Sequence, residues 1–138
     1  MTGMLASVSN LDEAMSVESI GVDIIDLKQP ARGALGALDV TTVRDIVTRL
    51  GADTTISATI GDLPMHPPRL ADAVTAMMET DVDFIKIGFF PEGDWQACIT
   101  RLGEICTRGH ALIAVSFADT DPDFAWIDAL AAAGFTGV

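Results

Sequence analysis

Short apolar stretches alternate with longer amphipathic stretches from one end of the chain to the other. The apolar stretches are rich in Val, Ile, Thr and Phe, which is typical of buried strands. We expect strands at residues 4–8, 23–28, 54–60, 83–89 and 110–117. The segments between them predict helices over about 10–19, 40–50, 68–80, 94–108 and 121–133. Such alternation favours an α/β fold with a parallel sheet, because each crossover returns the chain in the same direction.

Residues that start and stop helices lie at the edges of these segments. Ser9 or Asn10 can cap the first helix, because their side-chain oxygens accept hydrogen bonds from the first free amides. Thr120 or Asp121 precedes Pro122, which suits the opening turn of the last helix. Helices should stop at a set of glycines, namely Gly21, Gly51, Gly109 and Gly134.

A weak internal repeat runs along the chain. Residues 22–28, VDIIDLK, align with residues 82–88, VDFIKIG. Residues 134–138, GFTGV, match the stretch that begins at Gly21 but are cut short. The third copy therefore predicts the start of a sixth strand. We expect a single domain over residues 1–138 that forms the front part of something longer.

Composition excludes several classes of function. The chain has 138 residues, 49% of them hydrophobic, which is enough for one core. A net charge of −12 argues against nucleic acid as a partner. We expect a cytoplasmic protein with no membrane partner, because no apolar run is long enough for a membrane span and the N-terminus lacks a signal sequence. His66 has no second histidine or cysteine at ligand spacing, and no nucleotide fingerprint is present, so we expect no metal or cofactor.

Two lysines carry the most specific chemical signal. The chain has six arginines but only Lys28 and Lys86 as lysines, both towards the carboxyl ends of expected strands. Asp26 lies on the same face of its strand as Lys28, because side chains alternate. Among cationic side chains, lysine alone loses its proton readily enough to attack a carbonyl. We interpret Lys28 as a nucleophile, Lys86 as a neighbouring cation or acid, and Asp26 as a proton shuttle. The alternative is that Asp26 and Lys28 form only a buried ion pair.

Three further residues are candidates for substrate binding, each with a simpler explanation. Arg32 lies in a loop with several glycines, where it could meet a phosphate. Asp62 and Asp119 each follow a strand, where a second acid could contact substrate. Both carboxylates could equally cap a helix or face solvent.

The stretches MLASV, GVDIIDLKQPARGALGAL, ISATIGDLP and DFIKIGFF resemble the (5-formylfuran-3-yl)methyl phosphate synthases of methanogenic archaea and methylotrophic bacteria. The resemblance covers the whole chain in order. It implies a TIM-barrel lyase, without metal or nucleotide, that condenses two glyceraldehyde 3-phosphate molecules to a furan aldehyde phosphate in methanofuran biosynthesis. It also implies that Lys28 forms the Schiff base, with Asp26 and Lys86 in the same site.

Members of that family continue through three more strands, so the chain corresponds to about the first five βα units of a (β/α)8 barrel and the start of a sixth strand. An open sheet of this kind exposes apolar surface. We therefore expect either a homo-oligomer or a part of a longer product. Two other functions stay open: another class I aldolase-like barrel acting on a phosphorylated sugar, and an inactive half-barrel that serves as an assembly module.

Overall fold

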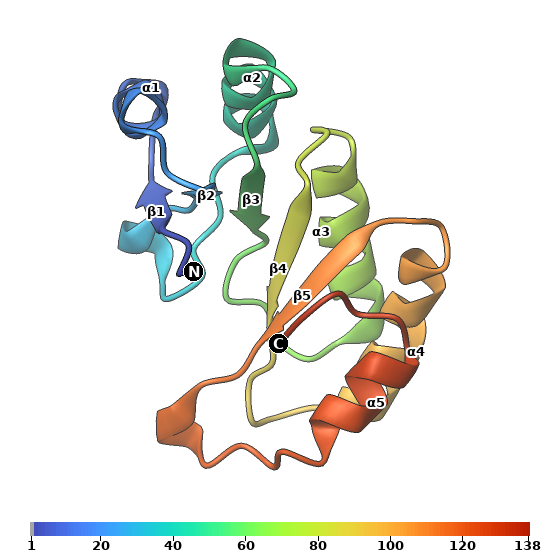
Figure 1. The fold of residues 1–138 in the computed structure, drawn as a ribbon. Helices are drawn as coiled ribbons and strands as arrows, with labels where there is room; N and C mark the ends of the chain where they lie inside the picture. The colour runs from blue at the N-terminus through green and yellow to red at the C-terminus, as the bar shows by residue number, and fades with distance from the viewer. Residues whose placement is uncertain (1) are drawn as a thin grey trace.

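A computed structural model describes residues 2–138. Its centre is a five-stranded parallel sheet in the order β1-β2-β3-β4-β5 (Figure 1). The strands are β1 (Leu5–Val8), β2 (Ile24–Leu27), β3 (Ile56–Thr59), β4 (Phe84–Gly88) and β5 (Ala111–Val115). Neighbours in sequence are neighbours in the sheet, as expected when every crossover has the same hand.

A helix follows each strand, so the alternation read from the hydrophobic pattern is confirmed. The helices are α1 (Leu11–Ile20), α2 (Val40–Leu50), α3 (Pro67–Met78), α4 (Trp95–Cys106) and α5 (Trp126–Ala132). Two short 3-10 turns, η1 (Pro30–Arg32) and η2 (Ala118–Thr120), follow β2 and β5. The expected boundaries of the first four helices lie within about two residues of these bounds.

The expected start of the last helix was wrong. Neither Thr120 nor Asp121 caps a helix at Pro122, because Thr120 closes the 3-10 turn by donating to the carbonyl of Phe117 at 2.7 Å. Asp121 then adopts a left-handed conformation with φ of 50°, which no α-helix continues. The helix α5 therefore begins only at Trp126.

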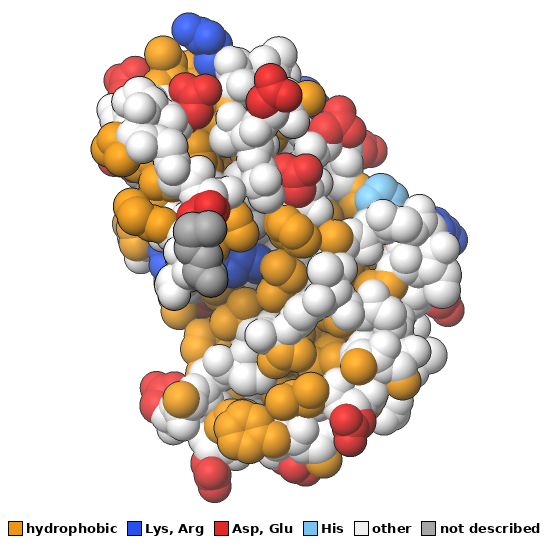
Figure 2. Space-filling view, viewed as in Figure 1, with side chains coloured by type: hydrophobic (Ala, Val, Ile, Leu, Met, Phe, Trp, Pro, Cys, Tyr) orange, Lys and Arg blue, Asp and Glu red, His pale blue; other side chains and the backbone are white. Residues whose placement is uncertain are grey.

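The apolar side chains of β2 and β4 are buried to different extents on the two faces of the sheet. Ile25, Leu27 and Ile87 on one face are completely buried under the helices, which lie together on that side of the curved sheet (Figure 1). Ile24 and Phe84 on the other face are only partly buried. Figure 2 shows many hydrophobic side chains in the middle of this view, with lysine or arginine nearby. We call this side the open face of the sheet.

The internal repeat has a structural basis at its aspartates. Asp23 accepts a hydrogen bond from the amide of Met4 at 2.5 Å and donates its own amide to the carbonyl of Met4 at 2.9 Å. Asp83 makes the same two bonds with Ile56, at 2.8 and 2.9 Å. In both copies the aspartate makes these bonds at the start of the preceding strand, with the residue just before β1 in one case and with the first residue of β3 in the other.

The third copy begins a sixth strand, as expected. The amide of Thr136 donates to the carbonyl of Leu112 at 2.9 Å, and the amide of Ala114 donates to the carbonyl of Gly137 at 3.0 Å. A parallel bridge joins Ile113 to Gly137. Residues 136 and 137 therefore extend the sheet beyond β5.

No helix within residues 2–138 combines the length and the apolar character that crossing a membrane would require.

A capping arrangement defines the start of α1. Asn10 accepts a hydrogen bond from the amide of Glu13 at 2.9 Å, which confirms Asn10 rather than Ser9 as the cap. The carboxylate of Glu13 in turn accepts from the amide of Ser9 at 2.7 Å and from the Ser9 hydroxyl at 3.0 Å. The backbone bond to Ser9, aided by the hydroxyl, lowers the pKa of Glu13 from its ordinary value of 4.5.

Replacing Glu13 by Gln should lower Tm at pH 7, because the neutral amide accepts the Ser9 amide less strongly. A carboxyl whose pKa is lower in the folded state stabilises the protein above the unfolded value and loses that effect as pH falls. The difference in Tm between the two proteins should therefore shrink as pH falls below about 4.5. Thermal unfolding between pH 3 and 7 measures it, with Glu18→Gln in the same helix as control. An equal difference at pH 3 and 7 would contradict the assigned role.

Candidate active site

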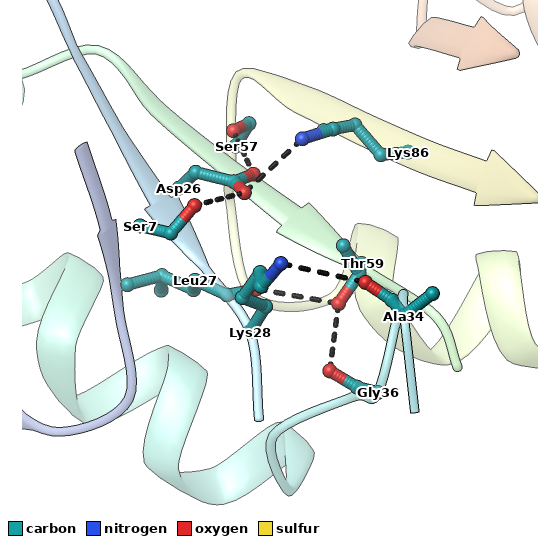
Figure 3. A network of polar contacts seen from close by, with 9 residues as sticks. All are labelled: Ser7, Asp26, Leu27, Lys28, Ala34, Gly36, Ser57, Thr59 and Lys86. Carbon is teal, nitrogen blue, oxygen red and sulfur yellow. Dashed lines mark hydrogen bonds and ion pairs between the residues drawn. The ribbon is translucent and has the colours of Figure 1, made fainter. Parts of the chain in front are cut away.

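Polar side chains gather on the open face near the carboxyl ends of the first four strands (Figure 3). They come from Ser7 on β1, Asp26 on β2, Ser57 and Thr59 on β3, and Lys86 on β4. Asp26 is aligned with both Ser7 and Ser57 in the strand register. Carboxyl ends of parallel strands meet at one edge of the sheet, where α/β folds build their sites.

Asp26 is the centre of this group and is only 1% exposed. One carboxylate oxygen, Oδ1, accepts from the Ser57 hydroxyl at 2.6 Å. The other, Oδ2, accepts from the Ser7 hydroxyl at 3.1 Å and lies 3.1 Å from Nζ of Lys86. A buried carboxylate is tolerable only with such partners, since desolvation of an unpaired charge costs several kcal/mol or more. We call these four side chains the Asp26 network.

Lys86 reaches Asp26 because the two residues occupy equivalent positions in the repeat, on strands that flank β3. In a barrel, inward side chains from alternate strands share one layer. Lys86 is 18% exposed, so most of its stem is covered while its ammonium meets the carboxylate. The position equivalent to Lys28 is Gly88, where an added Cβ would lie 2.8 Å from a methyl carbon of Leu35.

Lys28 lies one residue beyond β2 and does not pair with Asp26. Its ammonium donates to the carbonyl of Ala34 at 3.4 Å, and no carboxylate within residues 2–138 lies at ion-pair distance from it. The alternative of an Asp26–Lys28 ion pair is therefore wrong. Residues two apart on a strand are separated by about 6.6 Å, and both oxygens of Asp26 already have partners.

Arg32 lies in the loop that follows Lys28 and Asp62 binds that loop, so both side chains are already engaged. Nη1 of Arg32 donates to the carbonyl of Ala37 at 3.2 Å and to Asp39 at 3.1 Å, and the side chain is 57% exposed. The carboxylate of Asp62 accepts from the amides of Ala34 at 3.0 Å and Leu35 at 2.7 Å. Asp62 therefore holds a loop rather than capping a helix.

Asp119 is separated from this group. It lies in the 3-10 turn η2 after β5, where it is exposed. Its carboxylate takes part in no hydrogen bond or ion pair within the described chain. The structure brings Asp26 and Lys86 together, places Lys28 on the same face, and leaves Asp119 apart.

Sequence reasoning missed the hydroxyls. Ser57 and Thr59 are buried on β3, and Thr59 donates to the carbonyl of Gly36 at 2.9 Å. Ser7 donates to Asp26 from the neighbouring strand. Small polar residues at every second position of an apolar strand are the signal that could have identified Ser57 and Thr59, because such residues share the face that also carries Asp26.

A small cavity lies on the β1 side of Lys28. Its volume is about 160 Å³, and it is lined by Ser7, Val8, Ser9, Glu13, Lys28 and Pro30. Nowhere in residues 2–138 do three or more His, Cys, Asp or Glu side chains gather as a metal site would require.

The two lysines should differ in their effect on stability. Lys86→Met leaves the carboxylate of Asp26 buried without its countercharge and should lower the free energy of unfolding by about 3 kcal/mol. Lys28→Met removes only a contact to a carbonyl and should change it by less than about 1 kcal/mol. Urea denaturation measures both.

The double variant Asp26→Asn/Lys86→Met tests the cause of the Lys86 effect. It should be more stable than Lys86→Met alone, because the stranded charge is gone. Equal losses in the free energy of unfolding for Lys28→Met and Lys86→Met would contradict the Asp26 network.

Comparisons with known proteins address the fold first. The crystal structure of a dihydrodipicolinate synthase superposes with a TM-score of 0.71 at 8% sequence identity, covering 95% of this chain and 52% of that protein. The likeness confirms the expected partial TIM barrel.

Sequence comparisons address the family. A Methylorubrum extorquens protein, provisionally named a (5-formylfuran-3-yl)methyl phosphate synthase, is 39% identical over 135 residues, which are 97% of this chain and 54% of that protein. The synthase of that name from Methanocaldococcus jannaschii is 33% identical over 122 residues, covering 84% of this chain and 52% of the relative. The synthase from Methanopyrus kandleri is 38% identical over 87 residues, covering 63% and 37%.

The chain thus spans about half the length of its fuller matches among these relatives. The family model described as 4-HFC-P synthase matches residues 4–138, nearly the whole chain. The resemblance read from the strand motifs is confirmed: this chain belongs to the 4-HFC-P synthase family.

Proposed function

We propose that the chain carries the imine-forming part of a (5-formylfuran-3-yl)methyl phosphate synthase, a lyase that condenses two glyceraldehyde 3-phosphate molecules on the route to methanofuran. The observation that carries the proposal is the contrast between its two lysines. Lys86 is paired with the buried Asp26 at 3.1 Å, whereas Lys28 contacts only a neutral carbonyl.

This contrast supports Lys28 as the nucleophile. A lysine attacks a carbonyl only as the free amine. The ammonium of Lys86 is engaged by the buried carboxylate of Asp26 at 3.1 Å. Within residues 2–138, no carboxylate lies at ion-pair distance from Lys28, which borders the small cavity beside β1, so its ammonium is the one free to meet a substrate carbonyl. Lys86 then supplies the neighbouring positive charge.

In the proposed reaction, Nζ of Lys28 attacks the aldehyde carbon of one triose phosphate, and water leaves to give an imine. The imine makes the adjacent carbon acidic, and a base removes its proton to form an enamine. We propose that Asp26 and Lys86, which form an ion pair at 3.1 Å, accept and return these protons. The enamine carbon attacks the aldehyde of the second triose phosphate, forming the new carbon–carbon bond.

Eliminations and ring closure complete the product. Two triose phosphates contain the atoms of one furan aldehyde phosphate, one inorganic phosphate and two waters, and hydrolysis or exchange returns the Lys28 amine. The remaining phosphate needs a cation. Arg32 is the exposed cation on the loop after β2, and it would exchange its contact with Asp39 for the phosphate. Asp119 is proposed to contact a substrate hydroxyl.

Incubation with glyceraldehyde 3-phosphate and cyanoborohydride, followed by peptide mapping, tests the proposal. We expect a reduced adduct on Lys28, with the mass of one triose phosphate less one oxygen. Lys28→Met should abolish the adduct while the fold is kept. Lys86→Met should leave Lys28 unmodified or slow its modification at least about tenfold, because the neighbouring charge is lost.

The full-length synthase of Methanocaldococcus jannaschii serves as a positive control for trapping and product formation. An adduct on this chain together with furan product from the control supports the assignment. A trapped lysine in the control whose reaction yields a product other than the furan would favour an aldolase-like barrel. No adduct on either protein would overturn the imine mechanism, and an adduct only on the control would identify this chain as an inactive half-barrel.

A further inference from the structure

The loop over residues 29–38 is organised around the carboxylate of Asp62. This carboxylate comes from the segment after β3 and accepts two consecutive loop amides, those of Ala34 at 3.0 Å and Leu35 at 2.7 Å. A Cβ on Gly33 would lie 2.1 Å from Oδ2 of Asp62, so glycine is required there for the close approach. A single side chain thus ties this loop to the segment after β3.

The peptide unit between Ala34 and Leu35 links Asp62 to Lys28. Its N–H, on Leu35, donates to Oδ1 of Asp62 at 2.7 Å. Its carbonyl, on Ala34, accepts from Nζ of Lys28 at 3.4 Å. The N–H and C=O of one peptide are fixed in a plane and point in opposite directions. The carboxylate therefore orients, and polarises, the carbonyl that Lys28 contacts.

Other contacts hold the loop in place next to this peptide. Thr59, fully buried, donates to the carbonyl of Gly36 at 2.9 Å, and the amide of Gln29 donates to the same carbonyl at 2.7 Å. Leu35 is 6% exposed and fills the space next to Gly88. Rotation of the peptide away from Lys28 would break the hydrogen bond between the Leu35 amide and Asp62.

We propose that Asp62 is a positioning residue for Lys28, acting through the Ala34–Leu35 peptide, in place of the substrate contact expected from the sequence. The functional meaning of this role rests on the proposed imine chemistry at Lys28. The coupling between Asp62 and Lys28 does not rest on that chemistry, because it involves only the Lys28 ammonium and the Ala34 carbonyl before any substrate binds.

Other charges also face Lys28, and they define the controls. Asp26 lies on its own strand, paired with Lys86 from β4. Glu13 of α1 lines the small cavity with Lys28, and Arg32 lies in the same loop as Ala34. Asp62→Asn changes none of these groups. A change in the labelling of Lys28 in this variant is therefore due to the Asp62 carboxylate and the Ala34–Leu35 peptide that it binds.

Competitive labelling with trace acetic anhydride measures the effect, because Lys28 and Lys86 are the only lysines in the sequence and peptide mapping separates them. In Asp62→Asn we expect the labelling rate of Lys28 at a fixed pH to rise at least about threefold, because the Ala34 carbonyl that its ammonium contacts is no longer held by the carboxylate. The labelling rate of Lys86 should change by less than about 1.5-fold, because its own partner is unchanged.

Asp94→Asn is the matched control. Asp94 also accepts a backbone amide, that of Ala97 at 2.9 Å, but it caps α4 and does not touch the loop after β2. It should leave the labelling rates of both lysines unchanged. A folded Asp62→Asn protein whose Lys28 labelling rate equals that of the unsubstituted chain overturns the proposal.

A second measurement needs no substitution at Asp62. The amide resonance of Leu35 should shift in Lys28→Met, because the peptide that carries it loses the contact at its carbonyl. A Leu35 amide that is insensitive to Lys28→Met overturns the coupling even if Asp62→Asn fails to fold. Loss of imine trapping with the Leu35 shift intact would instead overturn the proposed function and leave the coupling in place.

Discussion

The buried charge of Asp26 is the constraint on which the rest of the site depends. A carboxylate that is 1% exposed must be satisfied by groups brought from other strands. Ser7, Ser57 and Lys86 supply these groups from β1, β3 and β4. The interaction therefore joins four strands of the sheet through their polar open face, whereas apolar packing under the helices joins them on the other face.

The same interaction gives the two lysines different partners. Lys86 is held as the countercharge of Asp26, so Lys28 is left to a neutral carbonyl. The repeat explains this asymmetry, because Asp26 and Lys86 are equivalent positions and Lys28 is equivalent to Gly88. The absence of a side chain at Gly88 leaves space for Leu35, which places the loop that carries the carbonyl partner of Lys28. The Asp26–Lys86 ion pair and the packing of Leu35 against Gly88 thus both result from the alternation of side chains along β2 and β4.

Much of the fold was predictable because it depends on local periodicity. Strand alternation correctly placed Asp26 and Lys28 on one face, and the truncated third copy of the repeat correctly indicated a sixth strand at residues 136 and 137. The predicted start of the last helix was wrong because one residue, Asp121, adopts a left-handed conformation that periodicity does not reveal. The alternative of an Asp26–Lys28 ion pair was also wrong, because it relied on proximity in sequence, whereas the partner of Asp26 comes from another strand.

The sequence by itself determined the order of strands and helices and the face on which Asp26 and Lys28 lie, because these follow from alternation. The resemblance of its strand motifs to a known family indicated the family, which the comparisons confirmed. Only the tertiary structure decided which charges meet. Lys86 lies 60 residues from Asp26 along the chain (86 − 26) yet 3.1 Å away in space, and Asp62 reaches Lys28 only through the loop it holds. Sheet register and loop packing set these distances, and neither is encoded by any single stretch of sequence.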